Sequence, residues 1–254
     1  MIIKNYLKEL IGKRVPGSFS KIRKDDIFLV SYPKSGNTWL RFLFGNLIYE
    51  EGVNFTNINS KIPDIYTSSK QELDSIKSPR IIKSHEPFLK CFQKVIYIYR
   101  DPKDVVVSYY FWFKKFNPEL DISFDNFFDK FIEGELTYGS WVDHFSKWEK
   151  VSKVTPEKII FISYEEMKKD TFNNFKKITH FCGFKFSDDL IKRAVAKSSF
   201  EEMKKDELKN ENDSFLNSTN TAIKFVRSGK SEWENYLSQN QIKIIENLSY
   251  KKNI

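Results

Sequence analysis

Residues 27–44 read IFLVSYPKSGNTWLRFLF, an apolar run, a polar segment with one glycine, and a second apolar run. The first run is apolar on both alternating faces, which is typical of a strand in a parallel sheet covered on both sides. The second run places Leu40, Leu43 and Phe44 at helical spacing, so residues 38–49 are expected to form a helix. The stretch therefore predicts a strand, a tight loop and a helix, the repeating unit of α/β domains.

Similar apolar runs occur at residues 80–83 (RIIK), 95–99 (VIYIY) and 159–163 (IIFIS). Helical patterns lie between or after them, at residues 102–113, 124–133, 140–151, 165–182 and 188–196. This alternation predicts one α/β domain over residues 1–254, with a central parallel sheet flanked by helices. Two polar stretches carry few signals and are expected to be irregular, namely residues 51–78 and a mobile loop at residues 206–220.

The chain has 42 basic and 34 acidic side chains, a formal net charge of +8. Such a balance suits an anionic partner, which can be nucleic acid, a membrane surface or a polyanionic small molecule. The two cysteines and three histidines form no CxxC-type pattern, so we expect free thiols, a cytoplasmic location and no metal site. No apolar stretch approaches the length of a membrane span, and no secretory leader is recognisable.

The polar segment at residues 32–39 (YPKSGNTW) joins the first predicted strand to its helix. Amide groups at a helix N-terminus, with Lys34 beside them, are suited to binding an anion, and Gly36 lets the backbone approach it closely. Lysine precedes the glycine, so this is not a Walker A sequence. Taken alone, the segment is also compatible with an ordinary turn and a solvated lysine. The side chains that can donate hydrogen bonds here are Ser35, Asn37 and Thr38.

Two further segments suit a second anion. In residues 99–110 (YRDPKDVVVSYY), Arg100 ends a strand and Ser108 lies about two turns into the next helix. An arginine fork suits a terminal phosphate, although Arg100 can instead pair with a neighbouring aspartate. Residues 225–233 (FVRSGKSEW) add Arg227 near the C-terminus.

Residues 83–87 (KSHEP) end the second predicted strand and contain a candidate base. His85 is suited to take a proton near neutral pH, and Lys83 lies beside it in the sequence. A lone histidine is more often structural, and this is what we expect of His144 and His180.

Taken in order, these segments resemble the soluble, cytosolic-type sulfotransferase family. YPKSGNTW is similar to that family's YPKSGTTW phosphosulfate loop, with Asn37 in place of a threonine. KSHEP resembles KTHLP, whose histidine is the catalytic base and whose lysine contacts the transferring group. Arg100 and Ser108 have the spacing of the family's 3′-phosphate motif. FVRSGKSEW resembles RKGxxGDW, with Ser228 replacing a lysine and one residue fewer before the tryptophan.

The resemblance also supplies an adenine cradle. Tyr164 in SYEEM matches a tyrosine of FYEDM, and residues 196–205 (AKSSFEEMKK) resemble HTSFKEMKK, which places Ser198 and Phe200 beside adenine. Trp39 can stack on the purine. The family's dimer motif is not recognisable in residues 234–246, so the oligomeric state stays open.

The resemblance implies a transferase that moves a sulfuryl group from 3′-phosphoadenosine 5′-phosphosulfate (PAPS) to a hydroxyl of a phenol, alcohol or sugar. The nucleotide product is 3′-phosphoadenosine 5′-phosphate (PAP), and the scheme needs no metal. Residues 109–116 (YYFWFKKF) either line the acceptor pocket or pack in the core. The implied catalytic residues are His85, Lys34, Lys83 and Ser108. The implied donor-binding residues are Lys34, Ser35, Gly36, Asn37, Thr38, Trp39, Arg100, Ser108, Tyr164, Ser198, Phe200, Arg227, Ser228 and Gly229.

Two other functions remain alternatives. An ATP-dependent small-molecule kinase shares the α/β class, but it predicts a Walker-type lysine that this sequence does not show. A basic nucleic-acid-binding protein predicts a charge stripe, whereas the lysines here are spread along the chain.

Overall fold

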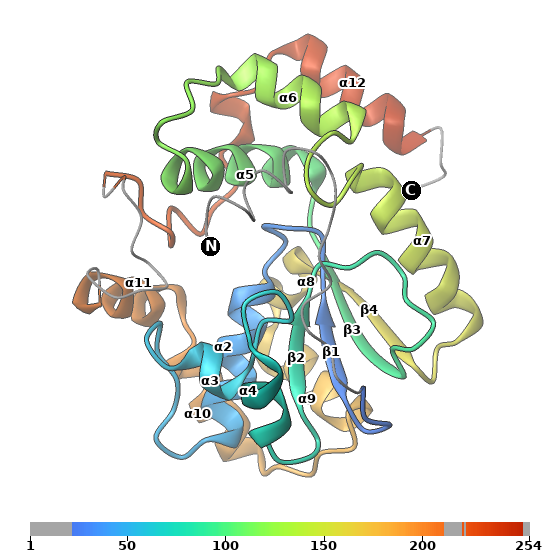
Figure 1. The fold of residues 1–254 in the computed structure, drawn as a ribbon, viewed down its shortest axis with the longest axis vertical. Helices are drawn as coiled ribbons and strands as arrows, with labels where there is room; N and C mark the ends of the chain where they lie inside the picture. The colour runs from blue at the N-terminus through green and yellow to red at the C-terminus, as the bar shows by residue number, and fades with distance from the viewer. Residues whose placement is uncertain (1–21, 211–219, 221, 251–254) are drawn as a thin grey trace.

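The computed structural model describes residues 22–210, 220 and 222–250. Its sheet has four parallel strands, β1 (Ile27–Val30), β2 (Ile81–Ser84), β3 (Lys94–Tyr99) and β4 (Ile159–Ser163), in the order β2-β1-β3-β4 (Figure 1). The predicted parallel sheet flanked by helices is confirmed. Around the sheet lie α2 (Asn37–Ile48), α3 (Ile58–Lys61), α4 (Lys70–Ser75), α5 (Pro102–Phe116), α6 (Phe124–Glu133), α7 (Trp141–Val154), α8 (Tyr164–Lys169), α9 (Thr171–Phe181), α10 (Asp188–Lys197), α11 (Phe200–Lys209), η1 (Trp233–Asn235) and α12 (Gln239–Tyr250).

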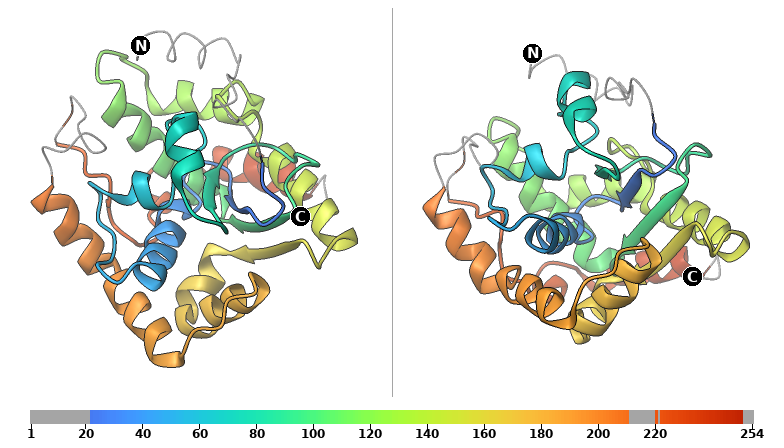
Figure 2. Two further views of the ribbon diagram at one scale, coloured as in Figure 1. Left: turned by 60° about the horizontal axis from the view of Figure 1, so that its bottom comes forward. Right: turned by 90° about the horizontal axis from the view of Figure 1, so that it is seen from below.

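Both faces of the sheet are buried, as the apolar strands require. Phe28 and Val30 face a core shared with α5, α6, α7 and α12, whereas Ile27 and Leu29 face a core shared with α2, α9 and α10. Side chains alternate across a strand, so one apolar run supplies both cores. In Figure 2, α9 and α10 (yellow to orange) lie on the opposite side of the strands from α5 and α6 (green).

The second strand begins one residue later than its apolar pattern predicts. Arg80, expected to open the strand, lies before it and forms a buried ion pair with Asp26, with Nη2 2.6 Å from Oδ2. A buried charge is tolerated only when it is paired and hydrogen-bonded, and Arg80 Nε also donates to Asp26 at 2.7 Å. The pair therefore joins the amino ends of β1 and β2.

Two expectations about helices are wrong. Residues 165–182 do not form one helix, because Asp170 ends α8 in a non-helical conformation and its side chain then accepts the Asn173 amide to cap α9. Residues 51–78 are not irregular throughout, since they contain α3 and α4, and a capping box between Ser69 and Glu72 starts α4. Of the expected mobile loop at residues 206–220, residues 206–209 belong to α11, and residues 211–219 lie outside the described residues.

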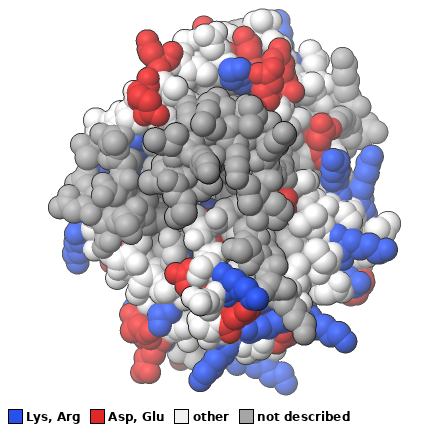
Figure 3. Space-filling model, viewed as in Figure 1, with Lys and Arg blue, Asp and Glu red and all other residues white. Residues whose placement is uncertain are grey.

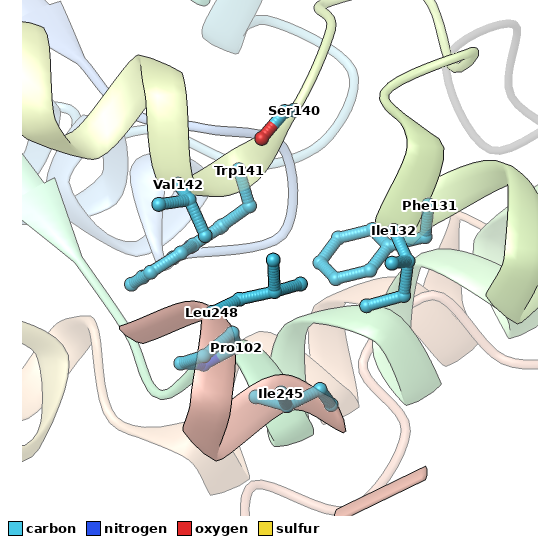
Figure 4. Close-up of a pocket in the computed structure, with 8 residues that line it drawn as sticks. All are labelled: Pro102, Phe131, Ile132, Ser140, Trp141, Val142, Ile245 and Leu248. Carbon is cyan, nitrogen blue, oxygen red and sulfur yellow. The ribbon is translucent and has the colours of Figure 1, made fainter. Parts of the chain in front are cut away.

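An apolar crevice lies among the helices on the α5 side of the sheet (Figure 4). Side chains from α6, α7 and α12 point toward one another across it, and no lining residue is titratable. The crevice therefore belongs to the packing of α12 and not to a reaction centre. Its lining residues are Pro102, Phe131, Ile132, Ser140, Trp141, Val142, Ile245 and Leu248.

The register of the parallel strands decides which loops meet. Val30 pairs with Ser84, so the residues that follow them, Ser31 and His85, lie side by side at the carboxyl edge. Ligand loops gather at this edge in open parallel sheets. Within the described residues, the helices are too short or too polar to cross a bilayer.

Candidate active site

The loop between β1 and α2 has the backbone conformation that its glycine allows. Gly36 precedes α2 at φ 102° in the left-handed region, and Lys34 also has positive φ, at 68°. A Cβ atom on Gly36 would lie 2.8 Å from the Tyr164 ring and 3.1 Å from Ile98 Cδ1. Only glycine fits here, and the loop is held against Tyr164.

Buried polar atoms in this loop have no hydrogen-bond partner among the described residues. Ser35 is fully buried and its Oγ is unbonded, as is Oδ1 of the buried Asn37. An unmade buried hydrogen bond costs about 1–3 kcal/mol. The free Ser35 hydroxyl at a helix N-terminus therefore fits a bound oxyanion, which would restore its hydrogen bond.

Asn37 differs from its expected role as a side-chain donor to the ligand. Its Nδ2 already donates to the Leu29 carbonyl at 2.8 Å and to Ser31 Oγ at 3.3 Å. The remaining Oδ1 is an acceptor only and cannot bind a phosphate oxygen. The Asn37 side chain therefore ties α2 to β1, which leaves its backbone amide for an anion.

Lys34 lies in a cationic environment. Its ammonium is 4.4 Å from the centroid of the Phe225 ring. Burial, and then the charges of Lys83, Arg100 and Arg227, lower the pKa of Lys34 to about 7, against a smaller opposite effect of Glu207. Three cations from separate segments thus act on Lys34, and a bound anion would offset their repulsion.

His85 is held as a neutral base. Its Nδ1 lies 2.7 Å from the Ser31 carbonyl, which can only accept, so Nδ1 carries the proton. No described residue bonds Nε2, whose lone pair is left to receive a proton. Burial and the charge of Lys83 lower the pKa of His85 well below its usual value. The ring contacts Tyr66, stacked at 6.4 Å, and Tyr138, edge-on at 5.2 Å, and these two rings also contact each other at 5.6 Å.

Lys83 is not a free cation. Its Nζ lies 2.5 Å from Asp64 Oδ2, and both side chains are largely buried. Residue 64 also forms a parallel bridge with Lys83 beside β2. Contact between Lys83 and a transferring group, as the resemblance implies, would therefore have to compete with Asp64.

Two of these cations are paired with carboxylates, and we name the four residues the arginine cluster: Arg100, Asp104, Arg227 and Glu232. Arg100 pairs with Asp104 at 3.3 Å, and Arg227 pairs with Glu232. The Glu232 amide donates to Asp104 Oδ1 at 3.4 Å, which links the two pairs, and Ser231 Oγ donates to the same oxygen at 3.1 Å. The Arg100 Nε is buried without a partner among the described residues, so the cluster has spare donors for an anion.

Aromatic rings lie next to Arg100 and next to the segment that carries Arg227. The Arg100 guanidinium lies 4.7 Å from the Tyr164 ring centroid, and the Trp39 ring is 5.5 Å from the same ring. A Cβ atom on Gly229 would lie 2.5 Å from Phe200, so the segment that carries Arg227 packs on that ring. Trp39 therefore lies beside Tyr164, and Gly229 lies beside Phe200.

Ser198 differs from its expected place beside adenine. It is fully buried, its carbonyl accepts the Trp39 indole N–H at 3.0 Å, and its hydroxyl accepts from Asn46 at 3.0 Å. These bonds fix the Trp39 ring, so Ser198 contributes through Trp39. Thr38 is partly exposed in the first turn of α2, and Ser108 is partly exposed on α5. The remaining predicted donor, Ser228, bonds its own turn, with Oγ 3.2 Å from the Lys230 carbonyl.

Several residues of the site carried no motif. Glu207 is buried on α11 and accepts the amides of Phe225 at 2.5 Å and Val226 at 2.7 Å, which holds the Phe225 ring against Lys34. Tyr66 accepts the His85 amide at 3.0 Å. Glu207 and Tyr66 each lie well apart in the sequence from the residues they bond, in segments without a periodic pattern. These contacts are therefore visible only in the folded structure.

Comparisons with known proteins identify the family of this chain. A sulfotransferase domain model matches residues 24–253. Sulfotransferase 1E1 of Bos taurus is 35% identical over 239 residues, 85% of this chain and 79% of that protein. Sulfotransferase 1A1 of Canis lupus familiaris is 32% identical over 206 residues, 73% of this chain and 68% of that protein.

Solved structures show the same likeness. The mouse sulfotransferase SULT7A1, whose structure is a complex with PAP, is 33% identical with a TM-score of 0.74, covering 96% of this chain and 88% of that one. A retinol dehydratase with retinol and PAP has a TM-score of 0.77 at 20% identity, which shows the fold alone. The family match spans nearly the whole sequence and the fold agrees, so this chain belongs to the sulfotransferase family.

Proposed function

We propose that this sulfotransferase moves the sulfuryl group of PAPS to a hydroxyl of a small-molecule acceptor, through one domain formed by residues 1–254. The observation that carries the proposal is His85, a buried neutral imidazole whose Nε2 is open beside a loop that presents Lys34 and an unbonded Ser35 hydroxyl. A nucleotide binder without chemistry would have no use for such a base.

His85 and its surroundings account for proton removal. With Nδ1 donating to Ser31, the ring accepts the acceptor's proton at Nε2 as the acceptor oxygen bonds sulfur and the sulfur–oxygen bond to phosphate breaks. The lowered pKa keeps His85 neutral, and therefore basic, near pH 7. The proton on Nε2 then passes to solvent.

The cations account for donor binding. When bound, PAPS would supply an activated sulfuryl group, and the loop amides, Ser35 and Lys34 would hold its 5′ end. Lys34 would stabilise negative charge on the departing phosphate oxygen, a contribution that can reach several kcal/mol in a prearranged site. Arg100, Arg227 and Ser108 would hold the 3′-phosphate, while Trp39, Tyr164 and Phe200 would flank adenine.

The test is turnover with radiolabelled PAPS and a panel of phenols, alcohols and sugars. We expect label transfer to at least one hydroxyl, inhibition by PAP, and loss of transfer in His85→Asn. The matched control is His180→Asn, because His180 is exposed on α9. Absence of PAP binding, or full activity of His85→Asn on the same acceptor, would contradict the proposal.

The same assay separates the alternatives. A kinase would transfer phosphate from ATP with magnesium to the same panel, and a nucleic-acid-binding protein would prefer RNA over PAP in competition. On the part of the face in Figure 3 that is not grey, acidic side chains lie mainly toward the top and basic ones along the right and lower edges. We therefore expect that neither ATP nor RNA displaces PAP, because neither should bind tightly.

A further inference from the structure

A buried histidine in residues 138–148 (YGSWVDHFSKW), a stretch that resembles a shared segment of the family and was expected to be structural, bonds the main chain of the proposed base. His144 lies in the first turns of α7 and is 2% exposed. Its Nε2 is 3.1 Å from the carbonyl oxygen of His85, and its Nδ1 is 2.8 Å from the hydroxyl of Tyr97 on β3. It therefore connects α7, β3 and the residue that carries the chemistry.

The chemistry of the partners decides where the protons of His144 lie. A carbonyl can only accept, so Nε2 of His144 carries hydrogen and donates to His85. In the neutral ring Nδ1 is then an acceptor, and the Tyr97 hydroxyl donates to it. Tyr97 is itself 1% exposed within the core, so it keeps its proton and holds His144 in this one tautomer.

Three hydrogen bonds hold His85, one at its amide, one at its ring and one at its carbonyl. The amide of His85 donates to Tyr66, its ring donates to Ser31, and its carbonyl accepts from His144. The Ser31 bond orients the ring about the Cα–Cβ and Cβ–Cγ bonds, but it leaves the backbone free to shift. The bond from His144 fixes the peptide plane after His85, from which the ring projects.

We propose that His144 is a positioning residue for the sulfuryl transfer, which aims Nε2 of His85 by holding its carbonyl. The inference rests on the proposed role of His85 as the base. His144 also meets the edge of Tyr32, with ring centroids 5.6 Å apart, and Tyr32 opens the loop assigned to the donor. The residue is thus placed where the base and the donor loop must be kept in register.

The test compares two replacements of His144. His144→Phe keeps the ring but removes the donor, and a displaced base should lower kcat by about ten- to hundredfold. His144→Gln supplies an amide N–H near the position of Nε2 and should recover most of this loss. The affinity for PAP should stay within about threefold in both variants, because no proposed donor contact is changed. His180→Gln, on the exposed face of α9, is the matched control and should keep native kcat.

The outcomes separate this inference from the function it rests on. If His85→Asn abolishes transfer and His144→Phe keeps kcat within about threefold of native, the positioning role is refuted and the base survives. Equal losses in His144→Phe and His144→Gln would also refute it, since the hydrogen bond would then be irrelevant. Should His144→Phe fail to fold, Tyr97→Phe removes only the bond that orients His144. It should lower kcat roughly three- to tenfold at unchanged PAP affinity, and unchanged kcat would overturn the proposal.

Discussion

His85 and the arginine cluster are held in place by opposite kinds of contact. Around His85 the contacts are neutral hydrogen bonds, two of them involving its own backbone, from Tyr66, Ser31 and His144. In the arginine cluster each cation is already paired with a carboxylate. Neutral hydrogen bonds fix the orientation of His85. In the arginine cluster, a ligand must displace the carboxylate partner of each arginine.

This difference predicts whether a substitution changes kcat or the affinity for the nucleotide. A base accepts a proton only when it is correctly oriented toward the donor, so substitutions near His85 should lower kcat. In the proposed function the arginines hold the 3′-phosphate, which does not react, so substitutions there should change the affinity for donor and product. The following changes test whether the two regions are separable in this way.

The largest effect is expected for His85→Asn. Removing the base should lower kcat by about 10²- to 10⁴-fold, with PAP affinity unchanged. In the native protein, burial keeps the pKa of His85 well below its usual value, so protonation should stop catalysis only in distinctly acidic solution. Steady-state kinetics across pH, with PAP titration by calorimetry, checks both points, and a kcat that falls on acidification through neutrality would contradict the assigned environment.

The next effect is on affinity, in Arg227→Gln. Loss of a charged hydrogen-bond donor should weaken PAP binding by about ten- to hundredfold. Glu232→Gln removes the competing carboxylate and should tighten binding roughly two- to fivefold, the scale of a partly exposed ion pair. Adenosine 5′-phosphosulfate, which lacks the 3′-phosphate, serves as the control ligand. If its affinity changes equally, Arg227 does not hold the 3′ end.

A third effect concerns pH and joins the two regions through Lys34. Its pKa in the free protein is about 7, and a bound anion favours the ammonium form. Binding above neutrality should therefore take up a proton, so PAP affinity should fall by at most about tenfold per pH unit above pH 7 and level off below it. Calorimetry in buffers of different ionisation enthalpy measures the uptake. Lys34→Met should abolish it, and persistence would assign the proton elsewhere.

Much of the site followed from local sequence because its parts come directly after apolar strands. Lys34, His85 and Arg100 lie just beyond β1, β2 and β3, and a parallel sheet brings such positions to one edge. What could not be predicted depends on strand register. The Asn37 side chain was expected to donate to a ligand, but its Nδ2 donates to the Leu29 carbonyl. This contact exists only once α2 is folded back onto β1.

Other contacts were hidden because they join segments without periodic patterns. Asp64 lies in a stretch expected to be irregular, yet it pairs with Lys83. The break at Asp170 was a local signal that the apolar pattern of residues 165–182 concealed, since Asp170 is also a good N-cap residue. His144 was expected to be structural, as part of residues 138–148, and its bond to the His85 carbonyl forms only when α7 packs against the carboxyl end of β2.

The smallest effect is expected for Ser228→Lys, which restores the residue that the resemblance leads one to expect. Ser228 bonds only its own turn, so the change should not disturb the fold, and one added surface cation should tighten PAP binding about two- to fivefold. The gain should vanish at about 0.5 M salt, where exposed charges are screened. Comparison with Glu232→Gln is informative because each raises the local charge by one unit. Equal, salt-sensitive gains would mean that the arginine cluster attracts phosphate by net charge alone, whereas a larger, salt-resistant gain in Glu232→Gln would show that pairing with Glu232 restrains Arg227.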